Sequence, residues 1–422
     1  MLGRQFYSTL NNLLSTTIAG TGGFNEHIQV SPVVLPERVF AQRTARLSIL
    51  RAFFETTLQI FRGVIDGKYS PELSRLLLCD VPESYGIKFH QELPSEVWTI
   101  PHFFRTDEAP DGRIFEIQCP GSGWGDLQLL TNLYARHFKS EAISKYQPSE
   151  LVAQEIVTLC GEAEPTVLHL LDNSSNPVSM RYLMATTQPP LHYWGYDKSV
   201  RNGKCHFVRS HSFFGLVAEN LFKVRVQDVS KGLVRFDLPP ILVFDQKAPL
   251  CLPFIEETRA QFPDEIRDSL VYSYPVSETG FLDHNGDWID IDGFLKRPAS
   301  QRKYFLKYAG CDVSRNWGSR SVFRLDDHSA TVHLKAAAAD AKRGRFWLIQ
   351  PEISQKEFVT FFDNHTYDSN REKWTAKHSC FYGATSLIGI RTMHRNHFKV
   401  HGQEDTAVGI AIPSYSAGGD EP

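Results

Sequence analysis

The segment 113-RIFEIQCPGSGWGD-126 places a strand-like run directly before a glycine-rich turn. Strand side chains alternate between two faces, so Glu116 and Gln118 are expected on the same face. A carboxylate and an amide at a strand end, beside glycines that let the backbone approach a ligand, can hold a hard cation such as Mg²⁺ next to a phosphate. Taken alone, the segment is more typical of a half-buried strand followed by an ordinary turn. The choice between this interpretation and a cation site therefore depends on the rest of the chain.

The neighbouring residues predict a β-hairpin with helices on both sides. Residues 98–118 have the pattern of two strands joined by the polar turn DEAPDG. Residues 36–80 carry apolar side chains at three- and four-residue spacing, which predicts helices. The first is expected to end at Gly67, and the second to begin with Ser70 as its N-cap. Residues 127–138, LQLLTNLYARHF, predict a further helix after the glycine-rich turn.

The composition is that of an ordinary globular protein. With 422 residues, two or three lobes are expected, and the net charge of -3 lacks the basic excess of nucleic-acid binders. The seven cysteines are scattered without a CxxC pair, which argues against a zinc ribbon and favours reduced thiols. The first residues lack the apolar stretch of a signal peptide, and no run approaches about 18 apolar residues. We therefore expect a cytoplasmic protein with no nucleic-acid and no membrane partner.

A second unit is expected to begin near residue 150. Strand patterns at 166–172 and 191–197 flank a helix pattern at 176–187, and this order predicts an open α/β layer. Residues 232–246, GLVRFDLPPILVFDQ, predict two short strands around a Pro-Pro pair.

The last third of the chain is rich in strand patterns. A helix is expected over residues 329–344, whose alanine run favours helix. Strands are predicted at 286–295, 303–310, 346–353, 386–393, 397–402 and 407–414.

Three features of this last third point to a ligand. Lys307 lies on an apolar strand just before a loop, so its ammonium either meets a ligand or reaches solvent. The loop 314–321, SRNWGSRS, is small and cationic; its amides and Arg315 or Arg320 could bind phosphate oxygens, although a polar hairpin tip has the same pattern. Gln350 ends the strand FWLIQ before a proline, where backbone groups either bind an adenine edge or close a core strand.

The order of these features resembles the ATP-grasp superfamily, which also has a later strand arginine, here Arg391. In ordinary ATP-grasp enzymes the metal-binding Glu-x-Asn follows these elements, whereas Glu116-Ile117-Gln118 precedes Lys307. That inverted order resembles the circularly permuted branch typified by glutathionylspermidine synthetase and its relatives. The resemblance implies an α/β (α+β) fold with mixed antiparallel sheets and a separate open α/β domain.

The resemblance also implies a division of the chain and roles for single residues. The parts are an N-terminal helical region with the metal-binding hairpin at 1–150, an α/β substrate domain at 151–255, ATP-binding lobes at 256–413 and a flexible tail at 414–422. The implied nucleotide-binding residues are Lys296 (or Lys303), Lys307, Gly318, Ser319, Ser321, Gln350 and Ile353. The implied catalytic residues are Arg320 and Arg391, and the implied metal ligands are Glu116, Gln118 and either Asp107 or Asp126.

Two motifs depart from the family pattern. The family carries Arg-x-Asp on the first strand of the hairpin, which the turn spacing places at 101–104, where PHFF contains neither residue. Arg105 and Asp107 lie nearby but closer to the turn, and would need a shifted register to take that place. Gln118 replaces the usual Asn and adds one methylene. The metal site is therefore expected to be rebuilt or weakened.

The resemblance implies an ATP-dependent ligase that joins a small-molecule carboxylate to an amine through an acyl phosphate, with ATP and Mg²⁺ as cofactors. A homo-oligomer is compatible with it. The alternatives are a degenerate relative that binds nucleotide or a partner protein without catalysis, and an unrelated α/β fold. His394, His397 and His401 could bind a metal from one helix face, but their alternating neighbours favour a strand with core or solvated histidines.

Overall fold

The computed structural model describes residues 2–17, 24–119, 123–161, 166–169, 176–188, 191–195, 206–209, 222–316, 320–400 and 403–414. Its α-helices are α1 (Leu2–Thr17), α2 (Glu37–Ile65), α3 (Pro71–Leu77), α4 (Ile87–Gln91), α5 (Trp124–Phe138), α6 (Glu141–Ser144), α7 (Pro148–Cys160), α8 (Asn176–Ala185), α10 (Phe222–Ser230), α11 (Glu256–Arg259), α12 (Asp264–Ser269), α13 (Ile291–Lys296), α14 (Val313–Asn316) and α15 (Ala330–Lys342). Short 3-10 helices are η1 (Glu83–Tyr85), η2 (Ser95–Val97), η3 (Leu242–Asp245), η4 (Ala248–Phe254) and η5 (Ala299–Gln301).

The strands fall into four sheets. The large sheet contains β1 (His27–Gln29), β2 (Val33–Leu35), β3 (Phe104–Glu108), β4 (Ile114–Gln118), β15 (Gln355–Phe362), β16 (Ser369–Tyr382), β17 (Leu387–Arg395) and β18 (Ala407–Pro413). The small sheet contains β9 (Tyr274–Pro275), β12 (Tyr304–Tyr308), β13 (Val322–Arg324) and β14 (Trp347–Pro351). A third sheet contains β5 (Thr166–His169), β6 (His192–Gly195), β7 (His206–Arg209) and β8 (Val234–Phe236), and β10 (Gly280–Leu282) pairs with β11 (Trp288–Asp290).

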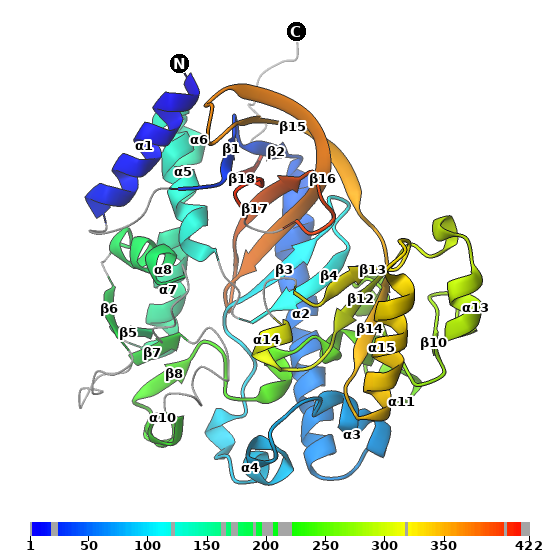
Figure 1. The fold of residues 1–422 in the computed structure, drawn as a ribbon. Coiled ribbons are helices and arrows are strands. Elements are labelled where there is room, and N and C mark those ends of the chain that lie inside the picture. The colour runs from blue at the N-terminus through cyan, green and yellow to red at the C-terminus, as the bar shows by residue number, and fades with distance from the viewer. Residues whose placement is uncertain are drawn as a thin grey trace.

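The large sheet joins distant parts of the chain. Its order is β15-β1-β18-β17-β16-β3-β4, and β15 also pairs with β16, so that this end curls back on itself (Figure 1). Helix α2 covers one face, because the apolar stripe that includes Phe54 packs with Phe104 and Tyr382. Helices α1 and α5 cover part of the other face through Phe6 and Trp124. The hairpin β3–β4 therefore lies at the edge of a sheet built mostly from the last 70 residues or so of the chain.

The two faces of the small sheet have different neighbours. Its order is β13-β12-β14-β9, and all its pairs are antiparallel. Leu306 and Ile349 pack with Leu334 of α15 on one face. Because strand side chains alternate, Lys307 and Gln350 project from the opposite face, where both side chains donate a hydrogen bond to the Phe115 carbonyl of β4. The two sheets thus meet at the hairpin segment with which the sequence analysis began.

The third sheet is the predicted open α/β layer. Its strands follow the order β6-β5-β7-β8, and every described pair is parallel. Parallel neighbours require crossover connections, and α8 lies between β5 and β6 in the chain. The predicted strand-helix-strand order is confirmed for these described segments.

Local signals fix several helix ends as expected. The Ser70 hydroxyl accepts a hydrogen bond from the Leu73 amide, with Pro71 in the first turn of α3. Gly67 follows α2 with a φ of 72°, a left-handed conformation that a side chain would disfavour.

Four sequence predictions of secondary structure are wrong. Residues 98–103 were expected in the first strand of the hairpin but lie before β3. The second strand expected within 232–246 is instead the 3-10 helix η3. Residues 291–296 form α13, because the Asp290 carboxylate caps it by accepting from the Gly293 amide. Residues 397–400 are not a strand. Short runs with apolar residues at mixed spacing fit a strand and a helical turn equally well, and tertiary contacts make the choice.

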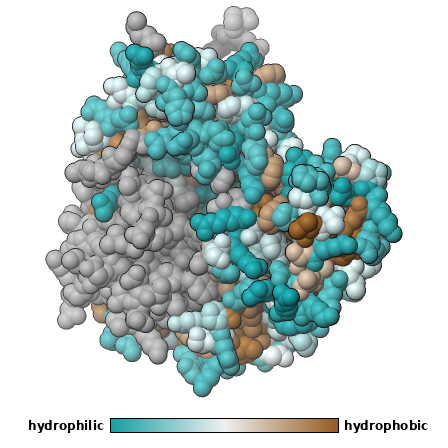
Figure 2. Space-filling view, viewed as in Figure 1, coloured by the Kyte–Doolittle hydropathy of each residue, from teal (hydrophilic) through white to brown (hydrophobic). Residues whose placement is uncertain are grey.

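The visible surface is mostly hydrophilic over the described residues (Figure 2). Exposed large apolar side chains such as Trp288, Val332 and Phe358 belong to different elements. None of the helices in the described ranges is long and apolar enough to cross a membrane.

Candidate functional site

The hairpin β3–β4 sets the geometry of the site. In its antiparallel register, Arg105 pairs with Gln118 and Asp107 pairs with Glu116, with a bulge after Asp107. The register expected from the turn spacing is therefore corrected to the shifted one: Arg105-Thr106-Asp107 lies on the first strand, directly opposite Glu116-Ile117-Gln118. The strand extends to residue 108, into the stretch that the sequence analysis assigned to the turn.

Asp107 is the centre of a buried ion-pair network. Its carboxylate accepts two hydrogen bonds from Arg105 at 2.9 and 3.1 Å, one from the Lys377 ammonium at 2.9 Å and one from the Ser379 hydroxyl at 2.8 Å. Strand β16 supplies Ser379 because it pairs with β3 at that position. Burial alone would raise the pKa of Asp107, but the two cations and the hydrogen bonds outweigh it and hold the pKa well below its usual range.

Glu116 belongs to a second, looser pair. Its carboxylate lies 3.4 Å from the Lys247 ammonium, which also donates to the side-chain oxygen of Asn316 at 2.6 Å and to its carbonyl at 3.1 Å. Burial raises the pKa of Glu116, but Lys247 and the more distant Lys307 bring it below the usual value. Neither Lys247 nor Lys377 was predicted, since a lysine in a polar or alternating stretch has no pattern that separates it from a solvated one.

Lys307 is buried on the face of the small sheet that meets β4. Its ammonium donates to the Phe115 carbonyl at 3.0 Å and lies 5.0 Å from the centre of the Phe115 ring. Burial lowers its pKa to about 8, against the opposing effect of Glu116. Gln350 donates to the same carbonyl at 3.2 Å and to the Ser273 hydroxyl at 2.7 Å. The structure thus brings Lys307, Gln350 and the Glu116 strand together.

Arg391 lies on the same face of the large sheet as Asp107. It is opposite Ser379 in the β16–β17 ladder, and its guanidinium is 3.0 Å from both Asp126 and Glu26. Asp126 is in the first turn of α5, and a Cβ on Gly123, whose φ is 93°, would lie 3.0 Å from the guanidinium. Asp126, an alternative metal ligand in the sequence analysis, is therefore an ion-pair partner of Arg391.

The oxygen ligands fit a hard cation only in part. Asp107 fits poorly, because its two oxygens already accept four hydrogen bonds. Glu116 has one long ion pair, and its neighbour on the same face, Gln118, offers an amide oxygen. Mg²⁺ commonly takes one or two protein ligands and completes its shell with phosphate and water. Within the described ranges, no group of three or more His, Cys, Asp or Glu side chains is arranged to hold a metal.

Other predicted residues lie away from this cluster or outside the described residues. Lys296 ends α13, whose Phe294 contacts Tyr304 on the face of the small sheet opposite Lys307. Lys303 shares the face of Lys307 by strand alternation but is exposed. Arg320 is exposed just before β13, and Gly318 and Ser319 lie outside the described residues. The Ser321 carbonyl accepts from the Tyr308 amide at 3.1 Å, and Ile353 is half-buried after β14.

Among the described residues, the histidines near the end of the chain belong to no group that could hold a metal. His394 is buried; its Nδ1 lies 3.0 Å from the Gln29 amide nitrogen, and its Nε2 lies 3.5 Å from Glu357. His397 accepts from the Lys399 amide, and His401 lies outside the described residues.

Comparison with known proteins supports the fold. No protein-family model matches the sequence, and no curated protein matches it. The structure is similar to a glutathione synthetase like-effector from Globodera pallida in its apo form, with 12% identity, 96% of each chain covered and a TM-score of 0.53. A protein from Methylobacillus flagellatus KT, named for gamma-glutamylcysteine synthetase, matches at 10% identity over 84% of this chain and 85% of that one, with a TM-score of 0.37, too low to support an argument. The chain therefore has a mixed α/β fold of the glutathione synthetase-like kind.

Proposed function

We propose that this protein is an ATP-dependent ligase of the permuted ATP-grasp type, which joins a small carboxylate to an amine. The observation that supports this most is the face-to-face placement of two elements from distant parts of the chain. The strands that carry Arg105-Asp107 and Glu116-Gln118 lie in the large sheet. The Lys307 ammonium of the small sheet donates a hydrogen bond to the second of these strands, at the carbonyl next to Glu116. The Lys307 ammonium is buried with a hydrogen bond to a neutral carbonyl, and the charge of Glu116 offsets its burial only in part, so a bound phosphate would stabilise it.

In this proposal the chain acts by positioning and by neutralising charge. ATP binds between the two sheets, with Lys307 on its phosphates and β14 along the base. Mg²⁺ held by Glu116 and Gln118 would neutralise charge on the phosphates. The substrate carboxylate attacks the γ-phosphate and releases ADP, giving an acyl phosphate. The amine then attacks the acyl carbon, phosphate leaves, and Arg391 steadies the oxyanion.

Trapping of the acyl phosphate tests the proposal without knowledge of the amine. Hydroxylamine attacks an acyl phosphate to give a hydroxamate and inorganic phosphate, so it replaces the natural amine. The protein with Mg²⁺-ATP, hydroxylamine and pooled carboxylic acids, including amino acids and small peptides, is expected to form hydroxamate in proportion to ADP. A matched reaction with the Glu116→Gln variant is expected to form at least about tenfold less hydroxamate, because the change weakens the proposed metal site. Absence of both products across the pool would contradict the ligase proposal.

One observation favours a second candidate, a protein that binds nucleotide without catalysis. The Lys377 ammonium already occupies the carboxylate of Asp107, which reduces the oxygen ligands left for a metal. Thermal stabilisation by ATP in the presence of Mg²⁺, without ADP release over the same pool, would favour this candidate.

The pKa of Lys307 predicts how nucleotide affinity depends on pH. With a pKa of about 8 in the free protein, the ammonium loses its proton as the pH rises through 8. A bound phosphate stabilises the ammonium and raises that pKa, so the association constant for ATP is expected to fall above pH 8 by up to about tenfold per pH unit. Calorimetric titrations at pH 7, 8 and 9 measure this. In the Lys307→Arg variant the decline is expected to disappear, because a guanidinium stays charged; an unchanged decline in that variant would assign the titration to another group.

A further inference from the structure

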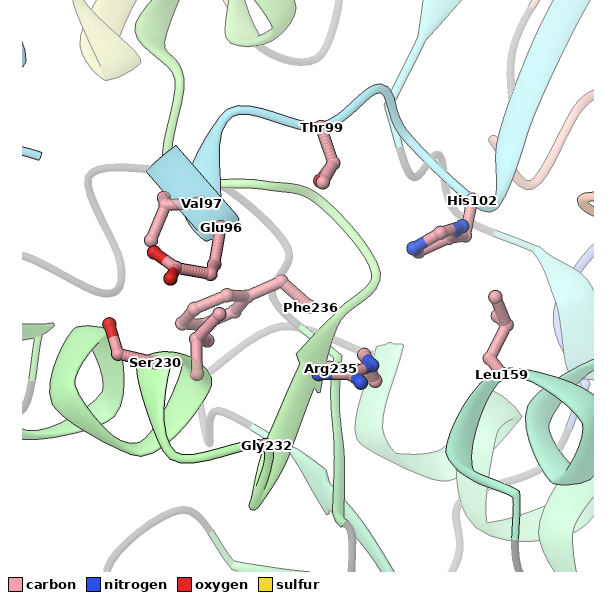
Figure 3. Close-up of a pocket in the computed structure, with 10 residues that line it drawn as sticks. Glu96, Val97, Thr99, His102, Leu159, Ser230, Gly232, Arg235 and Phe236 are labelled. Atoms are coloured by element: carbon pink, nitrogen blue, oxygen red, sulfur yellow. The ribbon is translucent and has the colours of Figure 1, made fainter. Parts of the chain in front are cut away.

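A cavity of about 410 Å³ lies apart from the Lys307 cluster, between η2 and the residues after it on one side and α10 and β8 on the other (Figure 3). Leu159 of α7 closes one end. This volume is in the range of small-molecule pockets. Figure 3 shows the Phe236 ring between the two ends of the cavity, with Val97 next to Glu96 at one end and His102 at the other. Its side chains come from both the α/β layer and the segment that leads into β3.

The first end carries the positive charge of Arg235 beside the ring of His102. His102 and Arg235 lie there with Leu159 in Figure 3. The main chain holds His102 in place, because its amide donates to the Asp237 carbonyl at 3.1 Å. The Arg235 guanidinium has one long hydrogen bond, to the Val234 carbonyl at 3.4 Å. Among the described residues, neither side chain forms an ion pair with a carboxylate.

Further positive charge surrounds this end. Burial, together with the nearby Arg51 and Arg235, lowers the pKa of His102 to about 4, so its ring is neutral at pH 7 and only the two arginines carry charge. Arg51 itself donates to the Ala384 carbonyl rather than to an acid. Among the described residues no carboxylate pairs with the half-buried Arg235, and an arginine that is partly removed from water gains from binding a carboxylate.

The second end is acidic and carries hydroxyl groups. Figure 3 places Glu96 and Ser230 there, on the far side of Phe236 from His102 and Arg235. Glu96 is exposed, and the Ser95 hydroxyl donates to its carboxylate at 3.3 Å. No cationic side chain among the described residues forms an ion pair with Glu96. This end of the cavity is therefore complementary to a cation at its mouth.

We propose that this cavity binds a small zwitterion, an amino acid or short peptide with an apolar body. Its carboxylate meets Arg235 and His102, its side chain packs on Phe236 and Val97, and its ammonium faces Glu96. The ligand class follows from the charges at the two ends and the apolar wall between them. Binding at this cavity requires no nucleotide, so its test is independent of the proposed ligase reaction.

Analogues of one amino acid test the proposal on the unmodified protein. Calorimetry without nucleotide would compare L-leucine and glycyl-L-leucine with 4-methylpentanoate, which lacks the ammonium, and 3-methylbutylamine, which lacks the carboxylate. At least one of the two zwitterions is expected to bind about tenfold or more tightly than either single-charge analogue, as expected for loss of one charged hydrogen bond. The proposal is overturned if neither zwitterion binds at a concentration of about 10 mM, which would mean an affinity too weak for a specific site. It is also overturned if 4-methylpentanoate binds as tightly as the zwitterions.

Two variants locate the site. Arg235→Gln is expected to weaken the zwitterion at least about tenfold, and Glu96→Gln about threefold, since Glu96 is more exposed. The matched control is Arg343→Gln, an exposed arginine after α15, which is expected to leave the affinity unchanged. Binding that is equally strong in Arg235→Gln and in the control would overturn the assignment of the carboxylate to this end of the cavity.

Discussion

The Asp107→Ala variant is expected to lose about 3–5 kcal/mol of folding stability, the usual cost of removing one partner from a buried ion pair. Asp107 is 2% exposed, and its carboxylate is the acceptor for Arg105, Lys377 and Ser379. Its removal leaves two cations buried at the junction of β3 and β16. Denaturant unfolding at pH 7 measures the loss. Asp111→Ala, in the turn of the same hairpin, removes an ion pair with the half-exposed Arg113 and is expected to cost under about 1 kcal/mol.

A double-mutant cycle separates charge pairing from lost packing. If the destabilisation comes from the unpaired ammonium, Lys377→Met should recover part of it. The combined variant is then expected to be more stable than the sum of the single changes by about 1–3 kcal/mol, the range for residues in one ion-pair network. Strict additivity would mean that Asp107 and Lys377 do not depend on each other, and the network described here would be wrong.

The Lys307→Met variant is expected to lose ATP affinity while keeping its stability. Lys307 is 5% exposed, and its ammonium has only the Phe115 carbonyl and ring as close partners among the contacts of the described residues. Methionine has a similar length and no charge, so the change removes a desolvation cost and is expected to leave the unfolding free energy equal or higher. The loss of a charged hydrogen bond to phosphate is expected to weaken ATP about 10- to 100-fold.

Measuring both ATP affinity and the free energy of unfolding distinguishes a ligand-binding lysine from a structural one. A structural lysine would give lower stability with unchanged affinity for ATP. A ligand-binding lysine gives lower affinity without lower stability, because the protein holds the charge for a partner that it does not itself contain.

The strand and helix periodicity predicted much of the architecture. The helix over residues 36–65, the strand that carries Lys307 and the strand that ends near Gln350 were all predicted, because each has a regular apolar pattern. The contact between the Glu116 strand and the Lys307 strand was predicted only from a resemblance in the order of motifs. No local pattern tells which strands become neighbours when the partners come from distant parts of the chain.

The register of the hairpin could not be predicted. Asp107 and Glu108 next to Pro110 are typical of a turn, yet both are buried strand residues. What keeps them there is distant in sequence: Glu108 is paired with Arg43 and Arg46 of α2, and Asp107 with Lys377 of β16. Buried acids are tolerated where cations meet them, and the sequence does not reveal that meeting.

In the proposed function, nucleotide binds between the two sheets at Lys307. The most direct test of this binding is a calorimetric titration of the full chain with ATP and Mg²⁺ at pH 7, alongside Lys307→Met and Lys296→Met. Lys296 is the matched control, an exposed lysine on the opposite side of the small sheet. We expect saturable binding to the unmodified protein and to Lys296→Met, and affinity about 10- to 100-fold weaker for Lys307→Met. No binding to the unmodified protein at millimolar ATP, or equal binding to all three proteins, would contradict the account.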